Sequence, residues 1–295
     1  MKRGIIITLL LAGMISGQVI AQDFIQIKGS DTLINLVQRL AEVYMEYHPN
    51  TAIAVTGGGS GVGIASLIQD RVHIANSSRN IKDKEIKMAQ DNGVTPYEIV
   101  VGIDGLSVIV NGKNPVKSLT VDQIGAIFRG DIKNWKEVGG VNKAISLYGR
   151  QANSGTFVFF MENVLGNKDY SANMKRMNGN SQIVEGVLAD EAGIGYVGIG
   201  YVYDDHHKVR SGLTVLSVAV KQGDKPVSPL VSENVKSGRY PIARTLLQYT
   251  NGKPSGAVKD FIAFELSPEG QKIVEDLSFF PVAGEYLKQN KKAGF

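Results

Sequence analysis

Segments that read as strands alternate with segments of helical spacing along most of the chain. Residues 24–28 alternate in polarity, and residues 33–47 then place apolar side chains at helical intervals until His48-Pro49. The same order continues with strands expected at 53–56, 72–75, 99–104, 106–111, 143–148, 195–201 and 243–249, and helices at 62–69, 83–91, 120–128, 156–165, 183–189, 257–265 and 268–276. Thr120 is the expected cap of the helix at 120–128. This alternation is typical of an α/β fold with a mostly parallel sheet.

The first 21 residues read as a secretory signal peptide. A basic start, Lys2-Arg3, precedes an almost wholly apolar run from Ile5 to Ile20, and small residues at Val19 and Ala21 suit cleavage before Gln22. An N-terminal membrane anchor is the alternative, but the apolar run is about 16 residues and a bilayer span needs roughly 20. We therefore expect the mature chain to begin near Gln22.

Composition narrows the class of protein. The chain has 295 residues, 43% of them hydrophobic, which suits two lobes or one large α/β domain. Without Lys2 and Arg3, 30 basic residues face 28 acidic ones, a charge too small to favour a nucleic-acid partner. There is no cysteine to form a disulfide or carry a lipid. A soluble protein of the bacterial periplasm fits these facts better than a lipoprotein, and we expect it to be a monomer.

Three Gly/Ser/Thr-rich loops each follow a strand and open a helix. They are Gly29-Ser30-Asp31-Thr32, Gly57-Gly58-Gly59-Ser60-Gly61 and Asn153-Ser154-Gly155-Thr156. Such loops offer free backbone N–H groups, hydroxyl donors and the positive end of a helix dipole. Any one of them could be an ordinary helix cap. Three in one chain favour a shared anion-binding site.

Two arginines accompany these loops. Arg150 stands four residues before Ser154 and could offer a two-donor fork to an oxyanion, or form a structural salt bridge instead. Arg79 follows Ser77-Ser78 at the end of an expected strand, where a parallel sheet opens toward its ligand. It could face the ligand or form a salt bridge between lobes.

Other functional patterns fail. The glycine loop matches neither a P-loop nor a dinucleotide-binding motif. Asp204-Asp205-His206-His207 has metal-binding residue types, but adjacent side chains rarely converge on one ion. No nucleophile–base arrangement stands out. We expect no enzyme activity, no metal and no cofactor.

The ordered motifs resemble those of a known family. An exported chain carries G-S-D-T, G-G-G-S-G, a small-residue turn with arginine and then R-x-x-x-S-G-T. In this order it is similar to the phosphate-binding proteins of ABC-type phosphate transporters, within the type II periplasmic binding protein superfamily. The similarity continues through residues 118–135, 193–201 and 240–274 and covers essentially the whole mature chain.

The resemblance implies a two-lobed fold that closes over one phosphate. Two crossing strands, near Asp104-Gly105 and Tyr240-Pro241, would join lobe one (23–104 plus 241–295) to lobe two (105–240), with the ligand cleft between them. Permease subunits in the inner membrane would be the partners. The expected phosphate-binding residues are Ser30, Asp31, Thr32, Ser60, Ser78, Arg79, Arg150, Ser154, Gly155 and Thr156.

One position departs from the family pattern. Many relatives place an aspartate where this chain has Ser78, and that aspartate accepts the proton of the bound phosphate and excludes sulfate. Asp31 is then either a helix cap or a replacement for this acceptor. Asp31→Asn is expected to weaken phosphate binding and relax discrimination against sulfate if the second interpretation holds.

Four functions stay open from the sequence. Phosphate transport is the main hypothesis, and another tetrahedral anion, sulfate or molybdate, is the alternative within binding proteins. A phosphatase could use Arg150 and the loop N–H groups to stabilise a transferring phosphoryl group. An adhesive or signalling role built on the same fold is the fourth.

Overall fold

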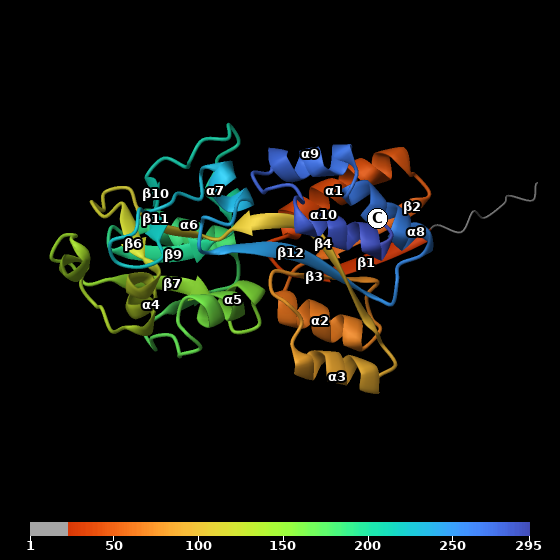
Figure 1. Cartoon of the computed structure of the whole chain (residues 1–295), viewed down its shortest axis with the longest axis horizontal. Helices are drawn as coiled ribbons and strands as arrows, with labels where there is room; N and C mark the ends of the chain where they lie inside the picture. The colour runs from red at the N-terminus through yellow and green to blue at the C-terminus, as the bar shows by residue number, and fades with distance from the viewer. Residues whose placement is uncertain (1–22) are drawn as a thin grey trace, which may run out of the picture.

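The computed structural model describes residues 23–295, and the expected signal peptide at 1–21 lies outside them. Two separate five-stranded sheets, each with its own helices, form the two halves of the molecule (Figure 1). Among residues 23–295 no helix is long and apolar enough to cross a bilayer. The α/β class expected from the alternating pattern is confirmed.

The first sheet has the strand order β2-β1-β3-β12-β4. Its strands are β1 (Asp23–Gly29), β2 (Thr51–Thr56), β3 (Ile74–Ser77), β4 (Pro96–Gly105) and β12 (Ala243–Asn251). Helices α1 (Ile34–Tyr47), α8 (Gly256–Glu265) and α9 (Pro268–Asp276) lie on one face, α2 (Ser60–Ile68) and α3 (Asp83–Asp91) on the other, and α10 (Glu285–Ala293) contacts β4 (Figure 1). The alternation of β1 buries Ile25 and Ile27 in this core.

The second sheet has the order β10-β5-β9-β7-β8. Its strands are β5 (Ser107–Asn111), β7 (Ser146–Arg150), β8 (Lys175–Met177), β9 (Gly193–Val197) and β10 (Leu213–Val215), and β6 (Ser118–Thr120) pairs with β11 (Ser217–Ala219) beside it. The helices of this half are α4 (Val121–Arg129), α5 (Gly155–Asn163), α6 (Asn180–Ala189), α7 (Ser232–Lys236) and the 3-10 turns η1 (Trp135–Val138) and η2 (Ile199–Tyr201). Thr120 caps α4 as expected, since its hydroxyl accepts from the Gln123 N–H at 3.1 Å.

The expectation of a mostly parallel sheet holds only in part, because each five-stranded sheet has two parallel and two antiparallel pairings. Strand β12 runs antiparallel to β3 and β4, and β5 runs antiparallel to β9 and β10. In the first sheet the cause is the path of the chain between the two halves: β4 leads to β5 through Leu106 alone, and β12 returns from the other half beside β4. A strand that leaves and a neighbour that returns must run in opposite directions (Figure 1).

Other differences concern element boundaries. The strand expected to reach Tyr201 ends at Val197 and is followed by η2, and α10 has no counterpart in the sequence-based prediction. Helix α2 starts at Ser60, two residues earlier than its apolar spacing predicts. The start at Ser60 brings that hydroxyl to the first helical turn, at the edge where the glycine-rich loop ends.

Candidate anion-binding site

The loops expected to bind an anion lie at one edge of each sheet. Strands β1, β2 and β3 are mutually parallel, so the loops that follow them share the carboxyl edge of the first sheet. Their hydroxyls meet there: Ser30 Oγ donates to Ser78 Oγ at 2.8 Å, and Ser60 Oγ lies 3.4 Å from Ser78 Oγ. All three serines are buried.

The loop after β7 in the second sheet closes against these three loops. Thr156 Oγ1 lies 3.0 Å from Thr32 Oγ1, and the Gly61 N–H donates to the Asn153 carbonyl at 3.0 Å. The Asn153 side-chain amide donates to the Gly58 carbonyl at 2.9 Å. The two halves are therefore in contact across the loops.

Two glycines make this close approach possible. Gly59 has φ +91°, and a Cβ there would lie 2.6 Å from the Asn153 carbonyl oxygen. A Cβ on Gly155 would lie 2.2 Å from Ser60 Oγ and 2.8 Å from Ser78 Oγ. Ser154 caps α5, its Oγ accepting from the Thr156 N–H at 3.2 Å, so the first turn of α5 faces the serines.

Arg150, at the end of β7, has a buried guanidinium that is only partly paired. The residue is 1% exposed. Its Nη2 donates to Asp31 Oδ2 and, at 2.7 Å, to the Asn178 carbonyl. Nε and Nη1 have no hydrogen-bond partner among residues 23–295. A buried, charged group with two open donors is costly unless an acceptor completes it, so the geometry favours an anion at this point.

Asp31 connects the two halves and is not a helix cap. Its Oδ1 accepts the Gly58 N–H at 2.8 Å while Oδ2 accepts from Arg150. The N-cap of α1 is Leu33, with no side-chain hydrogen bond, so the capping interpretation of Asp31 is wrong. The backbone of Asp31 is also held from the second half of the molecule, because the Tyr201 hydroxyl donates to the Asp31 carbonyl at 2.6 Å.

Arg79 is paired within its own half of the molecule. Its Nη1 and Nη2 donate to both carboxylate oxygens of Glu85 in α3, at 2.8 and 2.7 Å. Burial alone would raise the pKa of Glu85, but hydrogen bonds from Arg79 and the Lys82 N–H outweigh it and hold that pKa below its usual value. The alternative of a salt bridge between lobes is therefore wrong, because Glu85 belongs to the same half as Arg79, on a helix that packs against α2.

The prediction missed Arg244 and Asp104, which lie directly opposite each other on β12 and β4. Arg244 donates to Asp104 Oδ2 from Nε and Nη2, at 2.9 and 2.8 Å. It also reaches Thr156 Oγ1 at 3.1 Å and Thr32 Oγ1 at 3.3 Å. A single arginine in an expected strand belongs to no motif that would identify it as functional. Its role becomes visible only when the pairing of β4 and β12 places it opposite Asp104.

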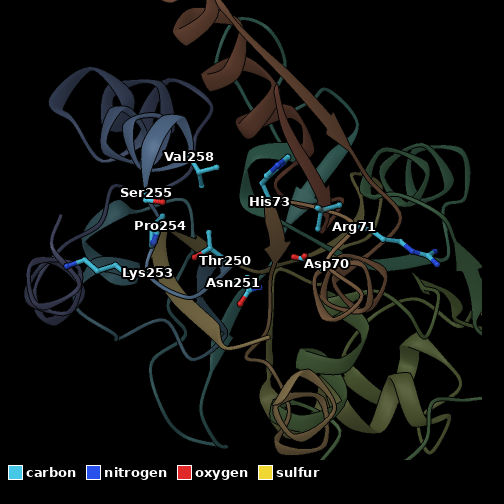
Figure 2. Close-up of a pocket in the computed structure, with 10 residues that line it drawn as sticks. Asp70, Arg71, His73, Thr250, Asn251, Lys253, Pro254, Ser255 and Val258 are labelled. Carbon is cyan, nitrogen blue, oxygen red and sulfur yellow. The ribbon is translucent and has the colours of Figure 1, made fainter. Parts of the chain in front are cut away.

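In two other regions of the molecule the polar side chains do not point toward a common ligand. A pocket of about 340 Å³ lies at the other end of the first sheet, beside the start of α8, but in Figure 2 Arg71 and Lys253 point away from each other. In the loop after η2, Asp204 accepts the backbone N–H groups of His206 and Lys208. Within the described part of the chain, no three His, Asp or Glu side chains are placed to hold a metal.

Comparison with known proteins agrees with this geometry. Residues 15–269 match the family model described as a PBP superfamily domain. The phosphate-binding protein PstS of Pseudomonas aeruginosa is 32% identical over 278 residues, covering 88% of this chain and 84% of that protein. The PstS of Bacillus subtilis is 33% identical over 271 residues, covering 90% and 83%.

A solved structure shows the same architecture. A Clostridium perfringens protein, crystallised with bound phosphate, superposes with a TM-score of 0.77 at 30% identity, covering 88% of this chain and 100% of that one. The two-lobed, type II fold expected from the motifs is thereby confirmed. With this architecture, the converging loops and the matches over most of its length, the chain belongs to the PBP superfamily and, within it, to the PstS family of phosphate-binding proteins.

Proposed function

We propose that this protein binds inorganic phosphate in the periplasm and delivers it to the permease of an ABC transporter in the inner membrane. Cleavage of residues 1–21 would release the chain as a monomer. Lobe one (23–104 plus 241–295) and lobe two (105–240) would close on the ligand about the strands β4 and β12. The closed form would then present a surface made by both lobes to the permease.

The observation that carries the proposal is the pair of open donors on Arg150. The N–H groups of Nε and Nη1 point to different sides of the planar guanidinium, so each suits a separate acceptor, and a phosphate oxygen would complete one of them. The proposed contacts add the hydroxyl and backbone donors of Ser30, Thr32, Ser60, Ser78, Ser154, Gly155 and Thr156. Most of these side chains are already buried, so phosphate would be bound without its water shell.

Asp31 is the proposed acceptor for the proton that phosphate carries near neutral pH. A carboxylate has about four lone-pair positions, and the Asp31 carboxylate accepts from the Gly58 N–H and from Arg150. It therefore retains capacity for one more donor. Sulfate has no proton to donate at neutral pH, and a carboxylate facing it would be repulsive, which gives discrimination. We assign Arg79 an indirect role, because its Nη atoms are engaged by Glu85.

Isothermal titration calorimetry on ligand-stripped protein tests the proposal. We expect one phosphate per chain, with much weaker binding of sulfate and molybdate in competition. Absence of phosphate binding would refute the proposal, and tighter binding of sulfate would assign the cleft to another oxyanion. A chromogenic phosphoester should not be hydrolysed; release of phosphate that is lost in Arg150→Ala would point to a phosphatase instead.

A further inference from the structure

The buried ion pair of Asp104 and Arg244 lies on the two strands that join the lobes. Their Cα atoms are direct partners in the antiparallel β4–β12 ladder. The Asp104 side chain is 0% exposed and that of Arg244 is 2% exposed. A fully buried ion pair is not needed to hold two paired strands together, and apolar residues often do so equally well. The pair therefore calls for a role beyond stability.

The guanidinium of Arg244 contacts groups from both lobes at the phosphate cleft. Nη1 donates to Thr156 Oγ1 and to the Ser78 carbonyl, both at 3.1 Å, and Nη2 donates to Thr32 Oγ1 at 3.3 Å. The guanidinium carbon also lies 5.4 Å from the centre of the Phe159 ring on α5. One side chain thus reaches a proposed phosphate donor in each lobe.

The direction of these hydrogen bonds fixes what the threonines can do. Arginine has donors and no acceptor, so each threonine oxygen that it contacts must accept. A hydroxyl that accepts from the arginine has its own single proton left to donate elsewhere. In the structure one of the two threonine hydroxyls donates its proton to the other at 3.0 Å, and an anion placed between the loops would draw both protons toward itself in place of this bond.

We infer that Arg244 is a positioning residue for the phosphate site, which orients the hydroxyls of Thr32 and Thr156 as donors toward the anion. The inference rests on the proposed function and assigns Arg244 no direct contact with phosphate.

Asp104 makes this orientation rigid. Its Oδ2 accepts two bonds from Arg244, and its Oδ1 accepts the Ile199 N–H of the second lobe at 2.8 Å. The carboxylate balances the charge of the guanidinium and fixes its plane. Arg244 is thereby held in hydrogen-bond contact with the two threonine hydroxyls and donates only to protein groups. Arg150 is the arginine whose charge faces the ligand.

A double-mutant cycle with inorganic phosphate as the probe tests the inference. The main variant is the neutral swap Asp104→Asn/Arg244→Gln, because it leaves net charge unchanged and avoids an unpaired buried carboxylate. This swap is introduced both into the wild-type protein and into the Thr32→Val/Thr156→Val variant, which lacks the two hydroxyls. Phosphate affinity is measured by calorimetry after circular dichroism shows cooperative unfolding for each variant.

In the wild-type background the swap should weaken phosphate binding roughly tenfold to hundredfold, as expected for losing well-oriented donors to a charged oxygen. In the background without the two hydroxyls it should change affinity by less than about threefold. Equal weakening in both backgrounds would overturn the inference and leave the ion pair a structural or purely electrostatic role. If wild-type protein fails to bind phosphate, the proposed function fails instead.

Two further variants keep the test decisive. Arg244→Lys retains the charge opposite Asp104 but lacks the planar fork that spans both hydroxyls, so its phosphate affinity should lie between those of wild type and the swap. Leu246→Ala opens a cavity on the same strand, where Leu246 is fully buried, without touching a hydroxyl. Its phosphate affinity should stay within about twofold of wild type, and a loss as large as that of the swap would contradict the inference.

Discussion

Arg150 gives the sharpest single test of the cleft. Its Nε and Nη1 are buried and open, and because their N–H groups point to different sides of the guanidinium, one phosphate would accept from one of them. A hydrogen bond to a charged group contributes about 1.5–3 kcal/mol, so losing this bond costs about that much. At about 1.4 kcal/mol per tenfold, Arg150→Met should weaken phosphate binding at least about tenfold to hundredfold.

Calorimetry on stripped protein measures this directly, with Arg129→Gln as the matched control. Arg129 pairs with Asp131 far from the loops, at the end of α4, so its loss should leave phosphate affinity unchanged. Arg150→Lys keeps the charge without the fork and should recover part of the loss. If Arg150→Met changes affinity less than about fivefold while Arg129→Gln is silent, the guanidinium does not face the anion and the geometric reasoning is wrong.

Three other changes probe separate features. Asp31→Asn should weaken phosphate binding and relax discrimination against sulfate in competition assays; unchanged selectivity would show that another group accepts the phosphate proton. Gly155→Ala should abolish binding and keep the lobes apart in small-angle X-ray scattering with phosphate, since its Cβ would lie 2.2 Å from Ser60 Oγ; Gly179→Ala, where a Cβ meets open space, should behave as wild type. Burial raises the pKa of Glu265 from 4.5 to about 8, so the unfolded chain loses that proton first and stability falls as pH rises between those values. Glu265→Gln should remove this pH-dependent loss in the free energy of unfolding, which amounts to at most about 5 kcal/mol at 1.4 kcal/mol per pKa unit. Melting temperatures that fall in parallel with rising pH in the two proteins would show that Glu265 is not the cause.

The sequence predicted the elements whose signals are local. Helix α3 was predicted with the bounds that the structure has, 83–91, and Thr120 was correctly predicted to cap α4, since a cap depends only on the first turn of its helix. The family motifs also sufficed to predict the two-lobed fold. These features depend on residues within one or two turns of each other, or on motifs in a fixed order.

Features set by distant residues were missed or misread. The direction of β12 depends on its return from the other half of the molecule, which no local pattern records. The Asp31–Arg150 contact joins residues 119 positions apart, and capping was one of two interpretations of Asp31 because it precedes an apolar helical run. Arg244 and Asp104 are 140 positions apart and become a pair only when their strands do.

A crystal structure with bound phosphate tests the central claim most directly. We predict one anion between the lobes, with one of its oxygens about 2.7–3.1 Å from Nε or Nη1 of Arg150 and others within hydrogen-bond reach of the hydroxyls of Thr32 and Thr156. Phosphate bound elsewhere, or bound in the cleft with both Arg150 nitrogens left without it, would contradict the account.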